Sequence, residues 1–402
     1  MKYSMFNTIV EEKDYLYMYN SLSGALLKLP KNELEKYEAT LCREGFLVED
    51  DKDEILAYKY IYYKKIFGKA NLNLTIAPTT SCNLCCPYCF EKGNKHAEYM
   101  DQEVIESIVK YIIAKKDRHI HITWFGGEPL LSYDKIVQLN NNLIDNDIQF
   151  HSSLITNGTL LNDNIIEKLP LLKLRNIQIT LDGNRTDHNQ KRFFLNKKGT
   201  FDIILSNLTK VLERTSIHIT LKINIDKSNI NSCLNLINDL TSEYSHYITT
   251  KQLAITNNSV KNRTNYEGCT NCLSEDEYFE FKTKVLHEKI PFPSLHLGCP
   301  LRYSEYLIIG PDGYIYKCLE HIGDKSKHVG NIKNYSFSIS KMAKLALGNE
   351  PFNDIECANC SILPICGGGC PISRAQKASD KNISLCPFLK NNLTSIIKDA
   401  CM

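Results

Sequence analysis

The chain of 402 residues lacks an excess of charge, a long hydrophobic run and an internal repeat. Its 48 Lys and Arg residues are nearly balanced by 46 Asp and Glu residues, for a net charge of +2, so nothing indicates a polyanionic partner such as nucleic acid. No apolar stretch is long enough to cross a membrane, and the N-terminal segment lacks the basic and then apolar pattern of a signal peptide. We therefore expect a soluble cytoplasmic protein with neither a nucleic acid nor a membrane as its partner.

Cysteine, by contrast, is abundant, with 16 residues. Reducing cytosol does not sustain disulfides, so clustered cysteines indicate metal ligation. The isolated Cys42, Cys233 and Cys401 are expected to be buried or incidental thiols. One group lies in a short loop and another in the C-terminal third: Cys82, Cys85, Cys86 and Cys89, then Cys299, Cys318, Cys357, Cys360, Cys366, Cys370 and Cys386.

Residues 1–70 are expected to form a small α+β unit of their own. Alternating apolar residues predict a β-hairpin over 6–30, and residues 31–51 predict a helix that runs into a strand. Such a unit resembles the peptide-binding winged-helix modules of some peptide-modifying enzymes, and it would then bind a leader peptide. The alternative is a plain extension that packs on the catalytic domain.

Residues 71–265 alternate between strand and helix patterns. Six strands that alternate with helices predict a parallel sheet curved into a partial (β/α)6 barrel of the TIM type, an α/β fold with its chemistry at the carboxyl ends of the strands. Residues 257–290 are expected to connect this barrel to a cysteine-rich domain, the whole C-terminal part spanning 266–402. The expected strands are 71–78, 119–125, 150–156, 175–183, 217–225 and 249–256, and the helices between them are 100–116, 133–146, 162–172, 200–215 and 230–244.

The first cysteine group directly follows the first expected strand. The spacing of Cys82, Cys86 and Cys89 lets one loop wrap three corners of a [4Fe–4S] cluster. Three thiolates leave one iron without a protein ligand, and an open metal position is a substrate site. A zinc site that also uses Cys85 is the alternative.

The sequence CNLCCPYCF, with Tyr88 before the third cysteine, resembles the signature of radical S-adenosylmethionine (SAM) enzymes. The next match is WFGGEPLL, which ends the second strand and resembles the family's glycine-glycine-glutamate-proline motif. There backbone groups and a carboxylate receive the SAM ammonium group. The matching residues are Gly126, Gly127, Glu128 and Pro129.

Later strand ends supply further candidate SAM contacts, namely Asn157, Asp182 and Asn224. The resemblance implies that Thr180 contacts the ribose and that Arg192 positions the SAM carboxylate. Asn-Gly and Asp-Gly are also ordinary turn formers, and Arg192 could instead pair with an acid. The chemistry implied is that of the cofactors: an electron from the cluster cleaves SAM, and the resulting 5′-deoxyadenosyl radical abstracts hydrogen from an unreactive C–H bond.

The C-terminal cysteines resemble the seven-cysteine SPASM extension of radical SAM enzymes. By this resemblance Cys357, Cys360, Cys366 and Cys386 ligate one auxiliary [4Fe–4S] cluster completely, so the chain would hold three such clusters. Cys299, Cys318 and Cys370 would ligate the other. Its fourth position is either open or closed by Cys269 or Cys272, which could instead form a redox pair.

Radical SAM proteins with this extension mostly modify peptides or proteins. The sulfatase-maturating branch typically has an acid where this chain has Leu319 and a glutamine where it has Phe125. We therefore expect an oxidoreductase that crosslinks a ribosomally made precursor peptide and takes electrons from a flavodoxin or ferredoxin. Formylglycine formation in a sulfatase and cluster storage without catalysis are the alternatives. No catalytic base is identified, since Glu91, Glu320 and His321 are more readily read as solvated surface residues.

Overall fold

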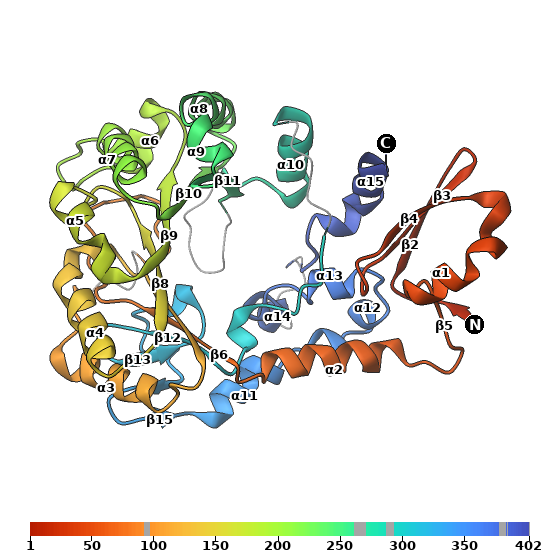
Figure 1. The fold of residues 1–402 in the computed structure, drawn as a ribbon, viewed down its shortest axis with the longest axis horizontal. Coiled ribbons are helices and arrows are strands. Elements are labelled where there is room, and N and C mark those ends of the chain that lie inside the picture. The colour runs from red at the N-terminus through yellow and green to blue at the C-terminus, as the bar shows by residue number, and fades with distance from the viewer. Residues whose placement is uncertain (92–96, 261–270, 287–292, 378–382, 384, 402) are drawn as a thin grey trace. The chain divides into compact units, whose positions relative to one another are not determined.

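The computed structural model of the protein describes residues 1–402 apart from 92–96, 261–270, 287–292, 378–382, 384 and 402 (Figure 1). The backbone forms two compact units. The first joins residues 1–68, 274–304 and 343–402, and the second joins 69–273 and 305–342. The domain limits expected from the sequence, near residues 70 and 265, follow the order of the chain and stay a prediction.

The second unit is built on a sheet whose strands follow the order β11-β10-β9-β8-β7-β6-β12-β13-β14-β15. Its first six members are parallel and run in sequence order, as the alternating pattern predicts. The mixed α/β class with a parallel, barrel-like core is confirmed. These strands are β6 (Asn71–Ile76), β7 (His119–Trp124), β8 (Phe150–Thr156), β9 (Leu174–Leu181), β10 (His218–Ile225) and β11 (Leu253–Ser259).

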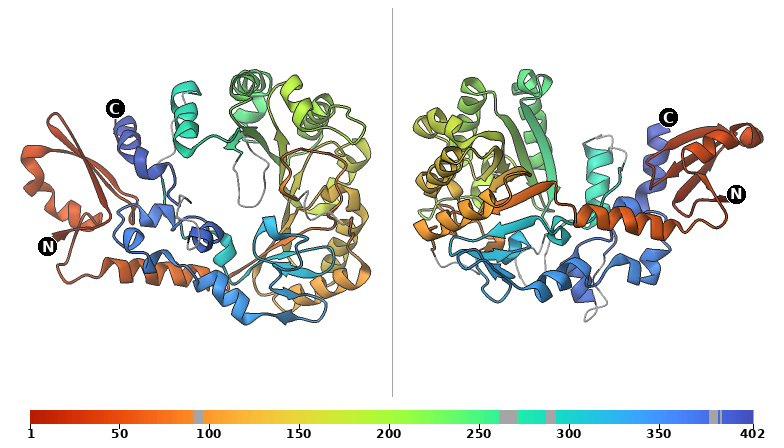
Figure 2. Two further views of the ribbon diagram at one scale, coloured as in Figure 1. Left: turned by 180° about the vertical axis from the view of Figure 1, so that it is seen from behind. Right: turned by 60° about the horizontal axis from the view of Figure 1, so that its bottom comes forward.

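Helices cover the outer face of these parallel strands (Figures 1 and 2). Burial alternates along β10, where Ile219, Leu221 and Ile223 are fully buried and the residues between them are not; this period of two is what a strand with one covered face requires. The sequence missed two short helices, α6 and α9. The helices are α3 (Gln102–Ile113), α4 (Tyr133–Asp145), α5 (Asp163–Lys168), α6 (Arg185–Lys191), α7 (Phe201–Arg214), α8 (Ile230–Glu243) and α9 (Ser245–Thr249).

Four strands that the sequence did not predict extend the sheet beyond β6. The first of them, β12, pairs with β6 in parallel, and the next three add antiparallel strands. Cys318, which follows β13, therefore belongs to the same unit as the first cysteine loop. These strands are β12 (Tyr306–Ile309), β13 (Tyr314–Tyr316), β14 (Gly330–Asn331) and β15 (Ser336–Phe337).

The N-terminal part of the first unit contains the expected hairpin and helix. The hairpin gains a third strand, so that the antiparallel order is β2-β3-β4. A 3-10 turn and α1 then lead to β5, which pairs with β1, whereas the long helix α2 was not predicted. The elements are β1 (Lys2–Tyr3), β2 (Asn7–Glu12), β3 (Tyr15–Asn20), β4 (Leu26–Pro30), α1 (Glu38–Arg43), β5 (Leu47–Val48) and α2 (Glu54–Ile66).

The C-terminal part of the first unit is helical. α10 lies within the segment expected to be a plain connection, and the capping box of Ser274 and Glu277 fixes its start. None of the described helices is long and apolar enough to cross a membrane. The helices are α10 (Glu275–Glu280), α11 (Ile339–Leu347, whose first four residues are assigned to the second unit), α12 (Ile355–Ala358), α13 (Leu363–Cys366), α14 (Pro371–Lys377) and α15 (Leu389–Cys401).

Candidate active site and cluster-binding residues

The glycine pair after β7 packs directly against the start of the first cysteine loop. A Cβ atom on Gly126 would lie 2.4 Å from the carbonyl oxygen of Thr79, and one on Gly127 would lie 2.3 Å from that of Ser81. The amide of Glu128 donates to the same Ser81 oxygen at 2.8 Å. Only residues without side chains allow this approach, so the glycines determine where the loop begins.

Glu128 is fully buried and binds three protein donors. One carboxylate oxygen accepts from the amide of Leu130 and the hydroxyl of Thr156, and the other accepts from the amide of Asn157. Burial raises the pKa of Glu128, and these hydrogen bonds oppose that rise. Glu128 thus joins the turns after β7 and β8. Its contact with a SAM ammonium stays a prediction, as does any role for the buried Pro129 that follows.

Asn157 links the turn after β8 to the cysteine loop. Its amide group donates to Asn83 at 2.8 Å and faces the Sγ atom of Cys82 at 3.9 Å. Thr159 completes the network, because its hydroxyl donates to the Asn157 oxygen and accepts from Asn83. The sequence pattern singled out Asn157 but missed Asn83 and Thr159, whose only signal is their position beside the two motifs.

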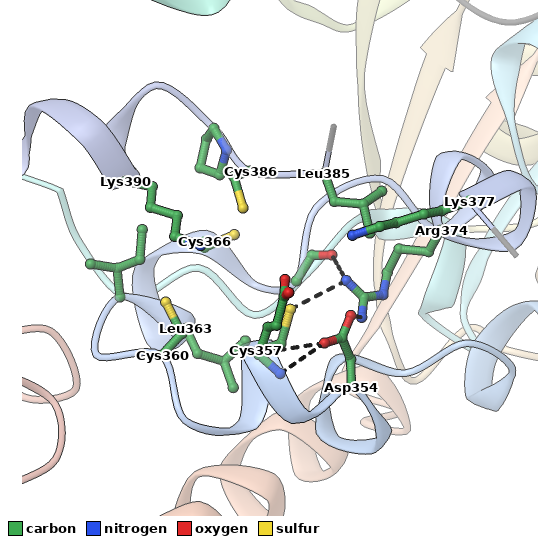
Figure 3. Close-up of a pocket in the computed structure, with 14 residues that line it drawn as sticks. Asp354, Cys357, Cys360, Leu363, Cys366, Arg374, Lys377, Leu385, Cys386 and Lys390 are labelled. Carbon is green, nitrogen blue, oxygen red and sulfur yellow. Dashed lines mark hydrogen bonds and ion pairs between the residues drawn. The ribbon is translucent and has the colours of Figure 1, made fainter. Parts of the chain in front are cut away.

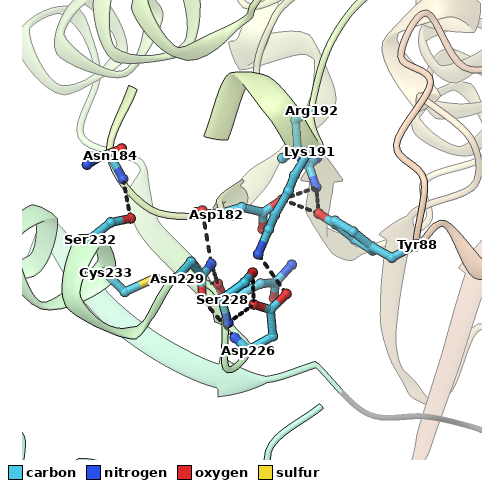
Figure 4. Close-up of polar contacts among 11 residues, drawn as sticks. Tyr88, Asp182, Asn184, Lys191, Arg192, Asp226, Ser228, Asn229, Ser232 and Cys233 are labelled. Atoms are coloured by element: carbon cyan, nitrogen blue, oxygen red, sulfur yellow. Dashed lines mark hydrogen bonds and ion pairs between the residues drawn. The ribbon is translucent and has the colours of Figure 1, made fainter. Parts of the chain in front are cut away.

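Tyr88, Asp182 and Arg192 form a cluster in which Asp182 is buried and the other two residues are partly buried (Figure 4). The Tyr88 hydroxyl donates to Asp182 and accepts from Arg192 at 3.0 Å, and Arg192 lies 4.0 Å from the Asp182 carboxylate. Burial raises the pKa of Asp182, although Arg192 and Tyr88 lower it. Arg192 is also close enough to lower the pKa of the Cys86 thiol, which burial raises. These three side chains therefore place the cation of Arg192 beside the cysteine loop.

Neighbouring side chains make further contacts around these three residues. The Nδ1 atom of His188 accepts from the Asp182 amide at 3.3 Å, and its Nε2 atom lies 2.9 Å from the Thr200 hydroxyl, which donates to the Arg192 carbonyl. Burial lowers the pKa of His188 to about 3, so the ring is neutral. Lys191 pairs with Asp226 at 2.6 Å at the end of the next strand (Figure 4).

Thr180 and Asn224 lie on neighbouring strands at the same edge. Thr180 is partly buried near the end of β9, where it pairs with Lys222 of β10. Asn224 lies two residues further along β10, beside the Asp182 carboxylate, whose pKa it lowers. The structure thus gathers the predicted SAM contacts at the carboxyl ends of β7 to β10, and their contacts with SAM stay predictions.

The first cysteine loop offers three partly buried thiols at the predicted spacing, Cys82, Cys86 and Cys89. The backbone amide of Cys85 donates to the Phe193 carbonyl at 2.8 Å, which ties the loop to the segment after Arg192. Three thiols beside a partly buried cation fit a [4Fe–4S] cluster with one open iron.

Four of the C-terminal cysteines line one pocket of the first unit: Cys357, Cys360, Cys366 and Cys386 (Figure 3). All four are free thiols. The buried guanidinium of Arg374 donates to the Sγ atom of Cys357 at 3.5 Å. Four thiols are the donor set that fits a fully ligated [4Fe–4S] cluster.

The remaining three cysteines fall in both units. Cys299 and Cys370 lie in the first unit and Cys318 in the second, so their common ligation stays a prediction. Cys269, one candidate for the missing fourth ligand, lies outside the described residues. Cys272, the other candidate, is disulfide-bonded in this structure, and its ligation of the cluster stays a prediction.

The expectation of solvated positions was wrong for Glu91, which is only 7% exposed. Glu320 and His321 are partly buried. Burial lowers the pKa of His321. A short sequence pattern gives no indication of such burial, because it depends on segments distant in the chain.

Residues 76–233 match the family model of the radical SAM superfamily. The chain therefore contains a radical SAM domain, and this match supports SAM and an iron–sulfur cluster as its cofactors. The resemblance drawn from the cysteine loop and the glycine motif is confirmed.

Curated relatives make the comparison more specific. The chain is 25% identical over 337 residues to a cysteine-type anaerobic sulfatase-maturating enzyme of Clostridium novyi, covering 75% of this chain and 88% of that protein. It is 22% identical over 325 residues to a serine-type anaerobic sulfatase-maturating enzyme of Klebsiella aerogenes, covering 72% and 77%.

Two solved structures share the fold. Native anSMEcpe with bound AdoMet has a TM-score of 0.58 at 20% identity, covering 82% of this chain and 99% of that one. Streptococcus suis SuiB bound to S-adenosylmethionine has a TM-score of 0.57 at 14% identity, covering 94% and 97%.

Proposed function

We propose that the protein is a radical SAM maturase that removes hydrogen from a side chain of a peptide or protein. The observation that carries the proposal is the contact of the Gly126–Gly127 turn with the backbone that leads into Cys82. It fixes a three-thiol loop next to the strand ends where the candidate SAM contacts gather.

In this proposal Cys82, Cys86 and Cys89 would hold the SAM-binding cluster. When bound, the cluster and SAM supply a 5′-deoxyadenosyl radical. The protein binds and orients: Arg192 provides the nearby positive charge for the SAM carboxylate, and Asp182 with Tyr88 holds the guanidinium. His188 stays neutral at working pH because of its depressed pKa, so it orients the Asp182 and Arg192 backbones without adding charge.

Precursor-peptide crosslinking is the preferred reaction, forming a thioether or carbon–carbon bond. Phe125 and Leu319 stand where the sulfatase-maturating branch would carry a glutamine and an acid, and both pack against one hydrophobic cluster that includes Ala77, Ile308 and Tyr316. Phe125 also stacks on Phe90 at a centroid distance of 6.4 Å. Apolar packing at both positions disfavours the polar chemistry of that branch.

The N-terminal unit supports a peptide substrate, with a leader segment bound by residues 1–70. The likeness to SuiB covers 94% of this chain, whereas that to anSMEcpe covers 82%. SuiB has been solved with its precursor peptide SuiA. We further propose two auxiliary [4Fe–4S] clusters on the C-terminal cysteines and a flavodoxin- or ferredoxin-type electron donor.

SAM cleavage is the first test. The protein is reconstituted anaerobically with iron and sulfide, reduced with dithionite and incubated with SAM, and 5′-deoxyadenosine is measured by chromatography. We expect turnover that is abolished in Cys82→Ala. An iron-loaded protein that does not cleave SAM would indicate an electron-transfer or cluster-storage protein.

The substrate is tested by co-expression with the short reading frames that neighbour the gene. We expect one peptide to lose two hydrogens for each crosslink, as measured by mass spectrometry. The alternative, sulfatase maturation, is supported by the curated relatives. A formylglycine product on a sulfatase-derived cysteine or serine peptide, with no crosslinked precursor, would establish it instead.

A further inference from the structure

Arg374 is the buried cation of the four-cysteine pocket. Its side chain is 4% exposed and each of its three nitrogens donates a hydrogen bond. Nη1 donates to the Sγ atom of Cys357 at 3.5 Å and to the Gly368 carbonyl at 3.1 Å, Nη2 donates to Asp354 at 2.9 Å, and Nε donates to the Asn349 carbonyl at 3.0 Å (Figure 3). These bonds fix the guanidinium against the sulfur.

A second buried arginine holds the same loop. Arg302 is 1% exposed, and its guanidinium donates to the carbonyls of Ala346 and Gly348 and, at 3.2 Å, to that of Asn349. The Asn349 carbonyl therefore accepts from both guanidinium groups. Arg374 is thus held by a loop that is itself anchored, and it lacks the freedom to turn away from Cys357.

We propose that Arg374 raises the reduction potential of the iron–sulfur cluster that Cys357, Cys360, Cys366 and Cys386 would hold. The inference rests on the proposed function, which assigns these ligands. One-electron reduction adds negative charge, and a fixed cation stabilises that charge more strongly in a buried site than in water. A hydrogen bond to a ligand sulfur acts in the same direction.

Asp354 opposes this effect. Its carboxylate lies 2.9 Å from Arg374 and neutralises part of the positive charge, while its other oxygen accepts from the amides of Glu356 and Cys357 and caps α12. Asparagine keeps the capping oxygen and removes the charge. Asp354→Asn should therefore shift the potential in the direction opposite to Arg374→Gln.

A raised potential suits an electron acceptor. When a substrate loses two hydrogens, one leaves as a hydrogen atom to the 5′-deoxyadenosyl radical, and the other leaves as a proton and an electron. The four-cysteine cluster would take that electron, and Arg374 would favour the transfer.

The test isolates this cluster in the full chain. A parent variant with Cys82, Cys86, Cys89 and Cys318 changed to alanine removes ligands of the other two sites. Iron and sulfide are counted, and the midpoint potential is then measured by a redox titration monitored by electron paramagnetic resonance. Arg374→Gln should lower the midpoint and Asp354→Asn should raise it. Lys377→Gln is the matched control, because Lys377 lines the same pocket and makes no hydrogen bond to a described cysteine.

Each outcome decides one point. If the parent variant binds no iron, the assignment of the four cysteines as cluster ligands is overturned, and with it that part of the proposed function. An iron-loaded Arg374→Gln variant with an unchanged midpoint, or with the shift of the Lys377→Gln control, overturns the inference alone. If Arg374→Gln fails to hold iron, the sign of the Asp354→Asn shift decides: a rise supports the inference, and no change or a fall overturns it.

Discussion

A Cβ atom on Gly127 would lie 2.3 Å from the carbonyl oxygen of Ser81, the residue before Cys82. No real Cβ atom approaches a carbonyl this closely, so the turn after β7 and the cysteine loop must separate if any side chain is introduced. The glycine motif therefore acts on the cluster site through backbone packing.

Gly127→Ala is expected to remove most of the iron bound by the first cysteine loop and to abolish SAM cleavage. The overpacked contact should also cost about 1–3 kcal/mol of stability. Iron analysis and the 5′-deoxyadenosine assay measure both effects. Gly24→Ala is the control for iron content and turnover, because a Cβ there meets no atom within 4 Å. Its positive φ of 76° carries a stability cost of its own, so stability is not compared with this variant. A Gly127→Ala protein with full iron and full turnover would contradict this account of the motif.

Tyr88→Phe is expected to weaken SAM binding about tenfold, which corresponds to about 1.4 kcal/mol. The change removes the hydroxyl that bridges Asp182 and Arg192 and leaves buried polar groups without a partner, at a cost of about 1–3 kcal/mol. SAM affinity is measured by equilibrium dialysis of the iron-loaded protein. Tyr133→Phe removes a hydroxyl bonded to the Lys168 carbonyl outside this cluster and should leave the affinity unchanged.

His188 should make the protein less stable as pH falls from about 6.5 toward 3. Its pKa in the folded protein is about 3, below the unfolded value of 6.5, so protons bind the unfolded chain more tightly in that window. The free energy of unfolding should lose up to about 1.4 kcal/mol per pH unit from this residue. Its contribution is fully present above the unfolded pKa.

A variant that lacks the His188 ring isolates this effect on stability. In His188→Asn, urea unfolding followed by circular dichroism should show a shallower decline of stability with acid. His246→Asn, at an exposed position, should keep the wild-type slope. Equal slopes in wild type and His188→Asn would show that the ring is not buried as described.

Cys233 should be chemically inert. Burial raises the pKa of its thiol to about 12, and the thiolate is the reactive form. Brief alkylation of the iron-free protein with iodoacetamide should leave Cys233 unmodified and label the exposed Cys370 and Cys386, as read by peptide mass spectrometry. Cys233→Ala should bind as much iron as wild type, and a loss of iron would make Cys233 a ligand.

The sequence predicted the parallel core because its signals are local. The alternation of apolar residues in β10 and the apolar spacing of α3 and α7 each arise within a single segment. The Cys82 and Gly127 motifs likewise each lie within one short loop. The bonds that organise the site join distant residues: Tyr88 bonds to Asp182 and Arg192, which lie 94 and 104 positions further along the chain. No spacing rule indicates such pairs, nor that Arg374 would turn toward Cys357.

Contacts between residues distant in the chain also explain the errors in the outer parts of the fold. β12 pairs with β6 more than 200 residues earlier in the chain, and its run of four apolar residues is too short for periodicity to distinguish a strand from part of a buried helix. Glu91 is charged and follows a cysteine loop, yet it is buried, because its environment is built by other segments.

The pairing of β12 with β6 also bears on shortened versions of the chain. Tyr306 to Ile309 occupy the hydrogen-bonding edge of the strand that leads into Cys82. A chain that stops at residue 273 would leave that edge open, and an open apolar edge recruits strands from other molecules. This shortened chain, which ends at residue 273, should therefore aggregate rather than yield an isolated barrel.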